Sequence, residues 1–531
     1  MDEESISIGK KRFTFAELFA GCGGISLGLK ATGFELAFAN ELSGMAAETF
    51  CYNLIYGHRP PTDNPEKWYA RICSPIFKHG KDGQVLEDPD AYRNKRPTAE
   101  FLSQLEKPTY KMFVGDIKKL VKALATAKLR GTLHRDFTNL DLLAGGPPCQ
   151  SFSLAGRREK DNKRNSLFES FAECAWILKP KVILFENVFG IIHPFTVSSN
   201  EKWHAWYDVA RLFFSKGYMP ICTVIKASNF GVPQDRKRFI MICIRKDLAV
   251  EAKRKFAGSR EWEDVLNALD LTSNHFKGRN ARVDSQLIYR DDRLGWPEPL
   301  LPSPDSNCIR SASQAIDDIV NAGRKDETDS VRGEYSVFLD VELPPPDGVQ
   351  SLCLPLNHEH RCHSTRTKVR FKVIQLLQSN NKLPSSIDQK HIKEEHIRIL
   401  FENKDRLILT DGRSGDMLES VKDVEELLEE LYSKKHSQRM LSKDKPAPGQ
   451  VSIPDDFVHY DASCPRTLTV REIARLQSFP DWFVFRSKAT TGGKLRSYEV
   501  PQYTQVGNAV PPLLAKQIGN GITRFLESVG G

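Results

Sequence analysis

One cysteine of this chain lies in a setting where a thiol could act as a nucleophile. Cys149 follows the apolar run Leu140–Ala144 and the dipeptide Pro147-Pro148. The apolar run predicts a buried strand, and the prolines prevent it from continuing. Open α/β sheets bind ligands at the carboxyl ends of their strands, and a thiol with a lowered pKa is a nucleophile there. An isolated loop cysteine usually has no catalytic role, so a role for Cys149 depends on what the rest of the chain contains.

A glycine-rich turn near the start of the chain predicts a ligand-binding loop. A short apolar strand leads into Phe19–Gly24, and a helix is expected to follow. Glycines let the backbone turn sharply and approach a ligand closely. A second strand, Phe34–Asn40, ends at Glu41, at about the 20-residue spacing of a ribose-binding carboxylate. Ser26 replaces the third glycine of the dinucleotide fingerprint, so this pattern alone fits a nicotinamide enzyme, a methyl-donor enzyme or a plain tight turn.

The order of strands and helices indicates how these groups are positioned. Strand and helix signals alternate from Phe13 to about Arg245, which predicts a doubly wound α/β sheet. Val182–Phe185 is predicted as a second buried strand, so Glu186 is expected at its carboxyl end. Two later strands are predicted at Ile221–Ile225 and Phe239–Ile244.

Six motifs follow one another in a recognisable order. They are Phe19–Gly24, Pro147–Gln150, Glu186–Val188, Gln234–Arg238, Leu468–Pro480 and Gly507–Val510. Together they resemble the ordered motif set of the DNA cytosine-5 methyltransferases, over about the first 245 and the last 95 residues. Six motifs in order argue against a chance match and against a dehydrogenase. The resemblance implies a doubly wound mixed sheet, the class I S-adenosylmethionine-dependent methyltransferase fold, with a second, smaller target-recognition domain.

The resemblance implies a covalent mechanism. Cytosine C5 is a poor nucleophile, and addition of the Cys149 thiolate to C6 would create an enamine-like carbon that attacks an electrophilic methyl group. Glu186 would contact the N3/N4 edge of the base and share or donate a proton, which requires burial to raise its pKa. Arg238 would contact the base, and Arg236 would support it or the backbone. The alternatives are a helix-capping role for Glu186 and a solvated basic turn for the two arginines.

S-adenosylmethionine is the methyl donor that the resemblance implies. Phe19 would stack near the adenine, Glu41 would bind the ribose, and Asp116 would bind the adenine amino group. Leu42 departs from relatives that carry an aromatic residue at this position, which would lower the affinity for the donor without removing the site. The expected donor-binding residues are Phe19, Gly21, Gly23, Glu41, Leu42, Asp116, Ile117, Leu167, Asn187, Asn508 and Val510.

The substrate that the resemblance implies is double-stranded DNA, from which such an enzyme must extrude its target cytosine. The segment 151–164 would be the mobile loop that closes on the strand, and its basic residues outnumber Glu159 and Asp161. Phosphate contacts would explain this excess, and a solvated charged loop is the alternative. Gln234 is expected to position the loop rather than to catalyse. The residues expected at the DNA are Gln150, Ser153, Arg157, Arg158 and Gln234.

Length and composition fit this interpretation without deciding it. A chain of 531 residues with a net charge of +8 suggests two or more domains and gives a mild argument for a polyanionic partner. Eleven cysteines without a CxxC pair do not form a disulfide pattern. The acidic start, Met1–Glu4, carries no apolar signal region, and the apolar runs are too short to span a membrane. A cytoplasmic setting is therefore expected. His358, His360, Cys362 and His363 lack a second ligand pair, so no metal is expected.

The domain organisation follows from the motifs and the composition. Residues 1–245 are expected to form the catalytic core, with a polar insertion at about 56–110. Residues 246–437 are expected to form the target-recognition domain, which would read base edges in the major groove. Residues 438–531 are expected to return to the core.

The sequence therefore predicts a DNA cytosine-5 methyltransferase, the modification half of a bacterial restriction system. It is expected to be a monomer, with a cognate endonuclease that it does not bind. Two alternatives stay open. A tRNA cytosine-5 methyltransferase would share the scaffold, although the long segment 246–437 favours DNA. A catalytically silent DNA-binding relative is the other, although Cys149 and Glu186 are both present.

Overall fold

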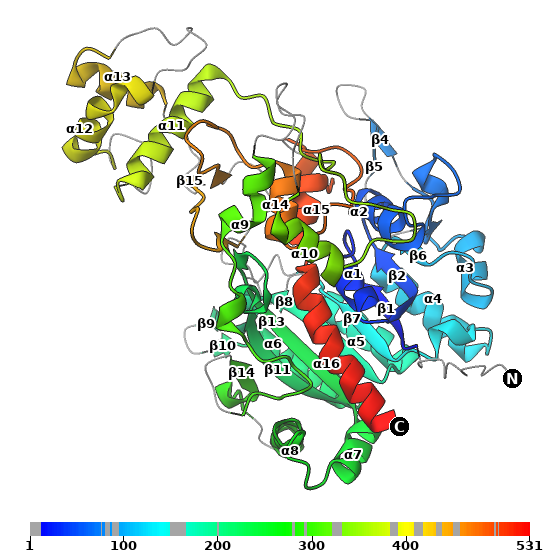
Figure 1. Ribbon diagram of the computed structural model, residues 1–531. Helices are drawn as coiled ribbons and strands as arrows, with labels where there is room; N and C mark the ends of the chain where they lie inside the picture. Colours follow the sequence, from blue (N-terminus) through cyan, green and yellow to red (C-terminus); the bar gives the residue numbers. More distant parts are fainter. Residues whose placement is uncertain are drawn as a thin grey trace, which may run out of the picture.

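One large sheet organises the computed structural model (Figure 1). The structure describes residues 12–75, 77–79, 85–87, 95–148, 166–198, 201–278, 282–290, 295–320, 332–382, 391–407, 418–431, 438–449, 457–492, 495–496 and 499–530. In the described part of the chain, no helix is both long enough and apolar enough to cross a lipid bilayer.

Nine strands pair in the order β14-β11-β13-β8-β7-β1-β2-β6-β3. β13 runs antiparallel to β11 and to β8, and the other neighbouring strands are parallel. The doubly wound mixed sheet expected from the sequence is therefore confirmed. The strand bounds are β1 Thr14–Leu18, β2 Glu35–Glu41, β3 Ala70–Arg71, β6 Met112–Val114, β7 Leu142–Gly145, β8 Val182–Val188, β11 Tyr218–Lys226, β13 Lys237–Arg245 and β14 Ile288–Arg290.

The central strands are apolar on both faces because helices cover both sides of the sheet. Successive residues of a strand point to opposite faces, so Leu142 and Val182 enter one buried cluster while Leu143 and Ile183 enter the other. The first face is covered by α1 (Gly24–Ala31), α7 (Lys246–Lys255), α8 (Glu263–Lys277) and α16 (Pro512–Gly530). The second is covered by α3 (Ala99–Glu106), α4 (Ile117–Leu129), α5 (Ser166–Leu178) and α6 (Ala205–Ser215).

The last helix, α16, lies against α1 although the two are separated by almost the whole chain (Figure 1). Gly28 makes this close contact possible, because a Cβ there would lie 2.5 Å from the backbone nitrogen of Lys516 and from the carbonyl oxygen of Pro512. The carboxyl-terminal segment therefore returns to the sheet and packs beside the first helix of the chain.

The sheet extends beyond the domain boundary expected at residue 245. β14 pairs with β11, and Ile288 and Tyr289 are buried. The helices α7 and α8 cover the same sheet. The expected boundary is therefore too early, because the segment up to Arg290 completes the sheet rather than starting a second domain.

A helical module stands apart from the sheet. It consists of α11 (Thr365–Ser379), α12 (Glu394–Glu402) and α13 (Val421–Glu430), shown in yellow-green and yellow in Figure 1. These helices share a buried cluster of their own, which includes Val373, Leu400 and Val424.

The remaining elements connect these parts. The longer ones are α2 Gly44–Phe50, α9 Ala312–Ile316, α10 Glu334–Glu342, α14 Val470–Leu476, α15 Gln502–Asn508 and a π-helix at Cys51–Ile55. The short strands are β4 Phe77–His79, β5 Val85–Glu87, β9 Phe195–Ser198, β10 Glu201–Trp203, β12 Gln234–Asp235, β15 Arg439–Met440, β16 Ala447–Pro448 and β17 Phe457–Val458.

Candidate functional site

Most of the expected site residues lie where parallel strands end. β1 leads into the glycine turn Phe19–Gly24, β2 ends at Glu41, β6 leads to Asp116, β7 leads to Gly146, and β8 carries Glu186 near its end. Because these five strands are parallel neighbours, their carboxyl ends form one edge of the sheet. This is the edge at which open α/β sheets bind ligands.

Glu186 is buried beside the backbone that leads to Cys149. Its side chain forms a salt bridge with Arg238, with 2.8 Å between Oε1 and Nε. A Cβ on Gly146 would lie 2.6 Å from Glu186 Oε2, so the glycine leaves room for the carboxyl group. Burial raises the pKa of Glu186, and the positive charges of Arg238 and Arg236 oppose that rise. The helical turn that follows β8 starts after Val188, whose side chain makes no cap hydrogen bond, and the Glu186 carboxyl group pairs with Arg238.

The two arginines of the expected motif are buried. Arg236 is 5% exposed and donates to the carbonyl oxygen of Gly507 at 2.8 Å, while Arg238 is 9% exposed and pairs with Glu186. The alternative of a solvated basic turn is therefore wrong. Arg236 instead connects the sheet to the carboxyl-terminal segment. The sequence alone did not decide whether Arg236 supports the base-contacting arginine or the backbone.

Asn187 holds the segment that precedes Cys149. Its side-chain amide donates to the carbonyl oxygen of Pro147 at 3.1 Å, and its side-chain oxygen accepts from the backbone N–H of Val188. Both polar atoms therefore contact protein backbone, which makes Asn187 a support for the strand ends in this structure.

Several expected residues lie outside the described part of the chain. These are Cys149, Gln150, Ser153, Arg157 and Arg158, together with the whole segment 151–164. Gln234 is described: its side chain is fully buried, and neither of its polar atoms has a hydrogen-bond partner among the described residues.

The glycine turn is built from residues in the left-handed region. Phe19, Gly21 and Gly23 have φ angles of 57°, 54° and 98°. A non-glycine residue with positive φ is uncommon, and Phe19 keeps this conformation while its ring stacks on Phe171 with centroids 6.5 Å apart. Among the described residues, no atom lies within 4 Å of a Cβ added to Gly21. The backbone of the turn therefore borders a space that no described residue fills and that a ligand could approach.

Glu41 fixes the turn from the neighbouring strand. Its two carboxylate oxygens accept from the backbone N–H groups of Gly21 at 2.8 Å and of Ser43 at 2.9 Å. Burial raises its pKa, and these backbone hydrogen bonds oppose the rise. Leu42, the next residue, is 45% exposed. An exposed apolar side chain beside a polar turn provides a surface on which a flat ligand could pack.

The other expected donor-binding residues are distributed around this edge. Asp116 is half-buried and caps α4 by accepting from the N–H of Lys118 at 2.8 Å. Ile117 and Val510 are buried, Leu167 is half-buried, and Asn508 is exposed.

The chain end reaches the glycine turn from α15 and α16. A Cβ on Gly24 would lie 2.2 Å from the carbonyl oxygen of Val510, and the Cys22 thiol donates to the carbonyl oxygen of Gln505 at 3.6 Å. The structure therefore brings residues 19–24 and 505–510 together, as the motif order required.

Buried charges around α14 did not stand out in the sequence. Arg466 makes two hydrogen bonds to Glu472, which overcome the effect of burial and lower the pKa of Glu472 to about 2. Arg475 likewise makes two hydrogen bonds to Asp481. The signal that could have revealed them is the concentration of charge inside the otherwise apolar Leu468–Pro480.

The histidine-rich segment serves the same helix. His358 contacts the hydroxyl of Thr469 at 2.9 Å, and Thr469 caps α14. His363 contacts Thr467 at 3.2 Å. Within the described residues, no group of three or more potential ligands could hold a metal ion.

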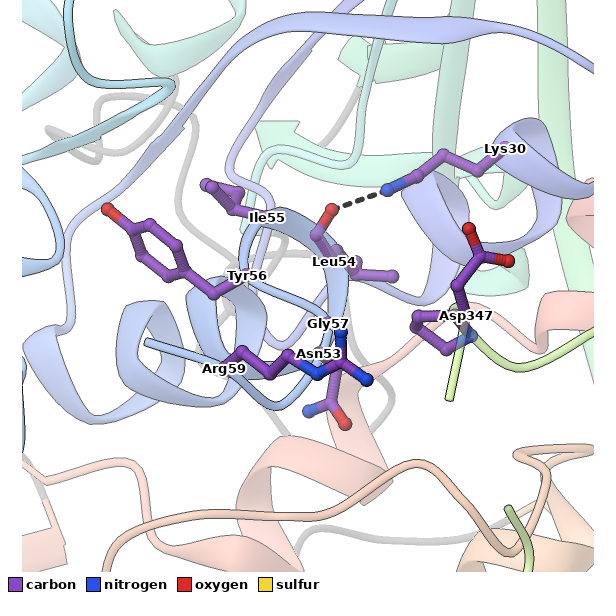
Figure 2. A pocket seen from close by; sticks show the side chains of 9 residues that line it. Lys30, Asn53, Leu54, Ile55, Tyr56, Gly57, Arg59 and Asp347 are labelled. Carbon is purple, nitrogen blue, oxygen red and sulfur yellow. Dashed lines mark hydrogen bonds between the residues drawn. The ribbon is translucent and has the colours of Figure 1, made fainter. Parts of the chain in front are cut away.

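A polar pocket of about 250 Å³ lies between the end of α1 and the π-helix (Figure 2). It is bordered by Lys30 of α1 and by Leu54 of the π-helix, whose side chain also packs against Gly23 of the glycine turn. Figure 2 shows the Lys30 ammonium bonded to the carbonyl oxygen of Leu54. Its full lining is Lys30, Asn53, Leu54, Ile55, Tyr56, Gly57, Arg59, Pro346 and Asp347.

Comparison with known proteins identifies a protein family whose model matches most of this chain. The family model for C-5 cytosine-specific DNA methylase matches residues 13–64, 98–295 and 354–524. The type II methyltransferase M.DdeI of Desulfomicrobium norvegicum is 25% identical over 521 residues, covering 97% of this chain and 89% of that protein. The DNA (cytosine-5-)-methyltransferase M.ApeKI of Aeropyrum pernix is 25% identical over 576 residues, covering 98% and 100%. The crystal structure of the S. pombe Dnmt2 methyltransferase gives a TM-score of 0.39 at 14% identity, covering 97% and 99%.

Proposed function

Because the chain belongs to the family of C-5 cytosine-specific DNA methylases, we propose that it methylates cytosine through a covalent adduct at Cys149. The chain is a DNA (cytosine-5-)-methyltransferase. The observation that supports the covalent step is the position of Glu186, which is buried against Gly146 at the end of the strand that leads to Cys149.

The first step forms the bond between the cysteine sulfur and C6 of the base. The Cys149 thiolate supplies the electron pair, and a proton from Glu186 neutralises the charge that would build on the ring nitrogen N3. Burial raises the pKa of Glu186, so this carboxyl group keeps a proton to a higher pH than an exposed one would. Arg238 keeps the carboxyl group in place through its salt bridge.

The second step uses the carbon that the first step activates. C5 then carries electron density and takes up the methyl group, and the donor leaves as a neutral thioether. A water molecule takes up the C5 proton, the electron pair of the C5–H bond re-forms the C5–C6 double bond, and the C6–sulfur bond breaks to return Cys149 as its thiolate. N3 gives its proton back to Glu186. S-adenosylmethionine supplies the electrophilic methyl group when it is bound. The residues that would hold it are those around the glycine turn, where Phe19, Leu42 and the open space over Gly21 fit a flat adenosyl group. Asp116 and Asn508 would contact its polar groups.

A cytosine inside a duplex cannot reach Cys149, so we propose that the base is extruded into this edge of the sheet. The segment 151–164, with Arg157 and Arg158, would follow the phosphate backbone. Gln150 and Ser153 would support that segment. The unpaired amide of Gln234 would bond to its backbone.

Sequence recognition is proposed for the part of the chain that does not complete the sheet. Because α7, α8 and β14 belong to the core, this part starts near residue 295 and includes the helical module α11–α13. A chimera that keeps the core and carries another enzyme's segment should methylate the site of the donor enzyme. A folded, active chimera that keeps the original site would place recognition elsewhere, with residues 56–110 the next candidate.

The relatives named as type II methyltransferases suggest the biological role. We propose that the enzyme protects cytoplasmic DNA of a bacterial host against a cognate restriction endonuclease. A monomer would suffice, since all six motifs stand on one chain. The enzyme and the nuclease would meet only through the shared DNA sequence.

Replacement of Cys149 tests the mechanism. Cys149→Ala should abolish methyl transfer and leave S-adenosylmethionine binding intact, because only the nucleophile is lost. A duplex with 5-fluorocytosine at the target should form a stable adduct with the wild type but not with Cys149→Ala, since fluorine at C5 blocks the final elimination. Cys362→Ala, at an exposed thiol, is the matched control and should behave as the wild type. Methylation by the Cys149→Ala variant would refute the covalent step.

A further inference from the structure

A carboxyl group that the proposed reaction does not use is buried beneath the glycine turn. Glu17 lies in the centre of β1 and is 2% exposed. Its partners in register on the neighbouring strands are Ala39 and Ala144, whose small side chains leave space on that face of the sheet. Glu17 Oε2 accepts from the backbone N–H of Ser26 at 3.0 Å and from the hydroxyl of the same residue.

This contact replaces a missing helix cap. The N–H of Ser26 is one of the first donors of α1, which a side chain at the capping position usually accepts. That position is Gly23, and a Cβ there would lie 2.3 Å from Leu54 Cδ1 and 2.8 Å from Phe50 Cδ2. No residue with a side chain fits, so β1 supplies the cap from below through Glu17.

Glu41 holds the same turn from the other side, so two carboxyl groups approach it. The groups that face Glu17 are Glu41 on β2, the Cys22 thiol in the turn and Ser26 on α1. Burial raises the pKa of Glu17 to about 8, and the charge of Glu41 adds to the rise, although the Ser26 hydrogen bonds oppose it. Burial also keeps the pKa of the Cys22 thiol far above its usual value, so the thiol stays neutral.

We propose that Glu17 is a positioning residue for the methyl donor, because it holds the first turn of α1, and with it the glycine turn. The inference rests on the proposed donor pocket at Phe19–Gly24. Glu17 caps the turn as a neutral carboxylic acid, and as the pH rises through 8 it becomes a buried anion beside the Glu41 carboxyl group. A buried anion must regain water or withdraw from its neighbour, and either change loosens the turn. The affinity for the donor therefore falls at alkaline pH.

The test compares Glu17→Gln, which keeps the shape without the charge, with Glu17→Ala, which removes the cap. Glu35→Gln, on the exposed part of β2, is the matched control. Calorimetry measures the affinity for S-adenosylhomocysteine between pH 6.5 and 9.5. The wild type and the control should lose about tenfold in affinity across this range. This loss corresponds to a rise of about one unit in the pKa of Glu17 when the donor binds. Glu17→Gln should bind as the wild type does at pH 7 and keep that affinity at pH 9.5.

Glu17→Ala should bind weakly at every pH. Wild-type pH dependence in the Glu17→Gln variant would overturn the proposal, and so would loss of affinity at pH 7 as large as that of Glu17→Ala.

Thermal unfolding without any ligand separates this inference from the proposed function. A folded-state pKa above the unfolded value gives stability that is complete at acid pH and disappears as the pH rises to about 8. The wild type should therefore lose stability between pH 6 and 8 relative to Glu17→Gln. If the wild type binds no S-adenosylhomocysteine, the proposed pocket fails. Equal unfolding curves for the two proteins would show instead that Glu17 is not held neutral.

Discussion

The salt bridge between Glu186 and Arg238 gives a prediction whose size follows from the structure. Both residues are 9% exposed, and their charged atoms are 2.8 Å apart. At an effective dielectric constant of about 20, two unit charges at this distance attract by about 6 kcal/mol before desolvation is counted. Breaking a buried pair by removing one partner usually costs about 3–5 kcal/mol. Arg238→Met should therefore destabilise the protein by about 3 kcal/mol at pH 8.

The same substitution should make stability depend on pH. Without Arg238, burial alone acts on Glu186 and its pKa rises further above the ordinary value. A carboxyl group with a raised folded-state pKa contributes stability at acid pH that is lost as the pH rises through that pKa. As the pH falls, the carboxyl group takes up a proton more readily than it does beside Arg238. The cost of the substitution should therefore fall as the pH is lowered from 8 to 5.

Urea unfolding of the wild type and of Arg238→Met between pH 5 and 8 measures both effects. The double variant Glu186→Gln/Arg238→Met is the control, because it carries no charge at either position and should show no added pH dependence. Equal destabilisation by Arg238→Met at pH 5 and pH 8 would refute the reasoning, since it would mean that Glu186 is not left as an unpaired anion.

Three further substitutions test the donor pocket and its closure. Asp116→Ala and Asn508→Ala should each weaken S-adenosylmethionine binding by about 1–3 kcal/mol in calorimetry, because each removes a hydrogen-bond partner of a polar group of the bound donor. Only Asp116→Ala should also lower the stability of α4, by about 1 kcal/mol, because it removes the cap of that helix. Unchanged affinity in both would contradict the pocket. Gly24→Ala should destabilise the protein by about 1–3 kcal/mol in urea unfolding, because its Cβ would lie 2.2 Å from the carbonyl oxygen of Val510. Gly492→Ala, whose Cβ meets nothing within 4 Å, should change little, and an equal effect of the two would count against close contact at Gly24.

Local patterns in the sequence were sufficient for the longer central strands of the sheet and for the order of the motifs. The strand predicted at Phe239–Ile244 lies within β13, and the one at Ile221–Ile225 lies within β11. Helices cover both faces of the sheet, so both faces of each central strand must be apolar. Such a strand appears in the sequence as a continuous apolar run, which can be recognised. The carboxyl ends of the strands then fix where polar residues such as Glu186 must gather.

The boundary near residue 245 was misplaced for the complementary reason. β14 is only three residues long and joins β11 across more than 60 positions of the chain. A strand of that length has no periodicity to detect, and its place in the sheet depends on a pairing between distant segments. The composition of the segment after Arg245 is also more polar than that of the core, although α7 and α8 each bury one face.

The sequence by itself determined which chemical groups this enzyme has and in what order, because each motif is a local pattern of a few residues. Only the tertiary structure decided how those groups are held. It buried Arg236 against the carbonyl oxygen of Gly507, 271 positions away, and bonded the buried side-chain amide of Asn53 to the carbonyl oxygen of Val484, 431 positions away. Both contacts replace water around a buried polar group. The loss of that water depends on which distant segments pack together, and no short stretch of sequence contains that information.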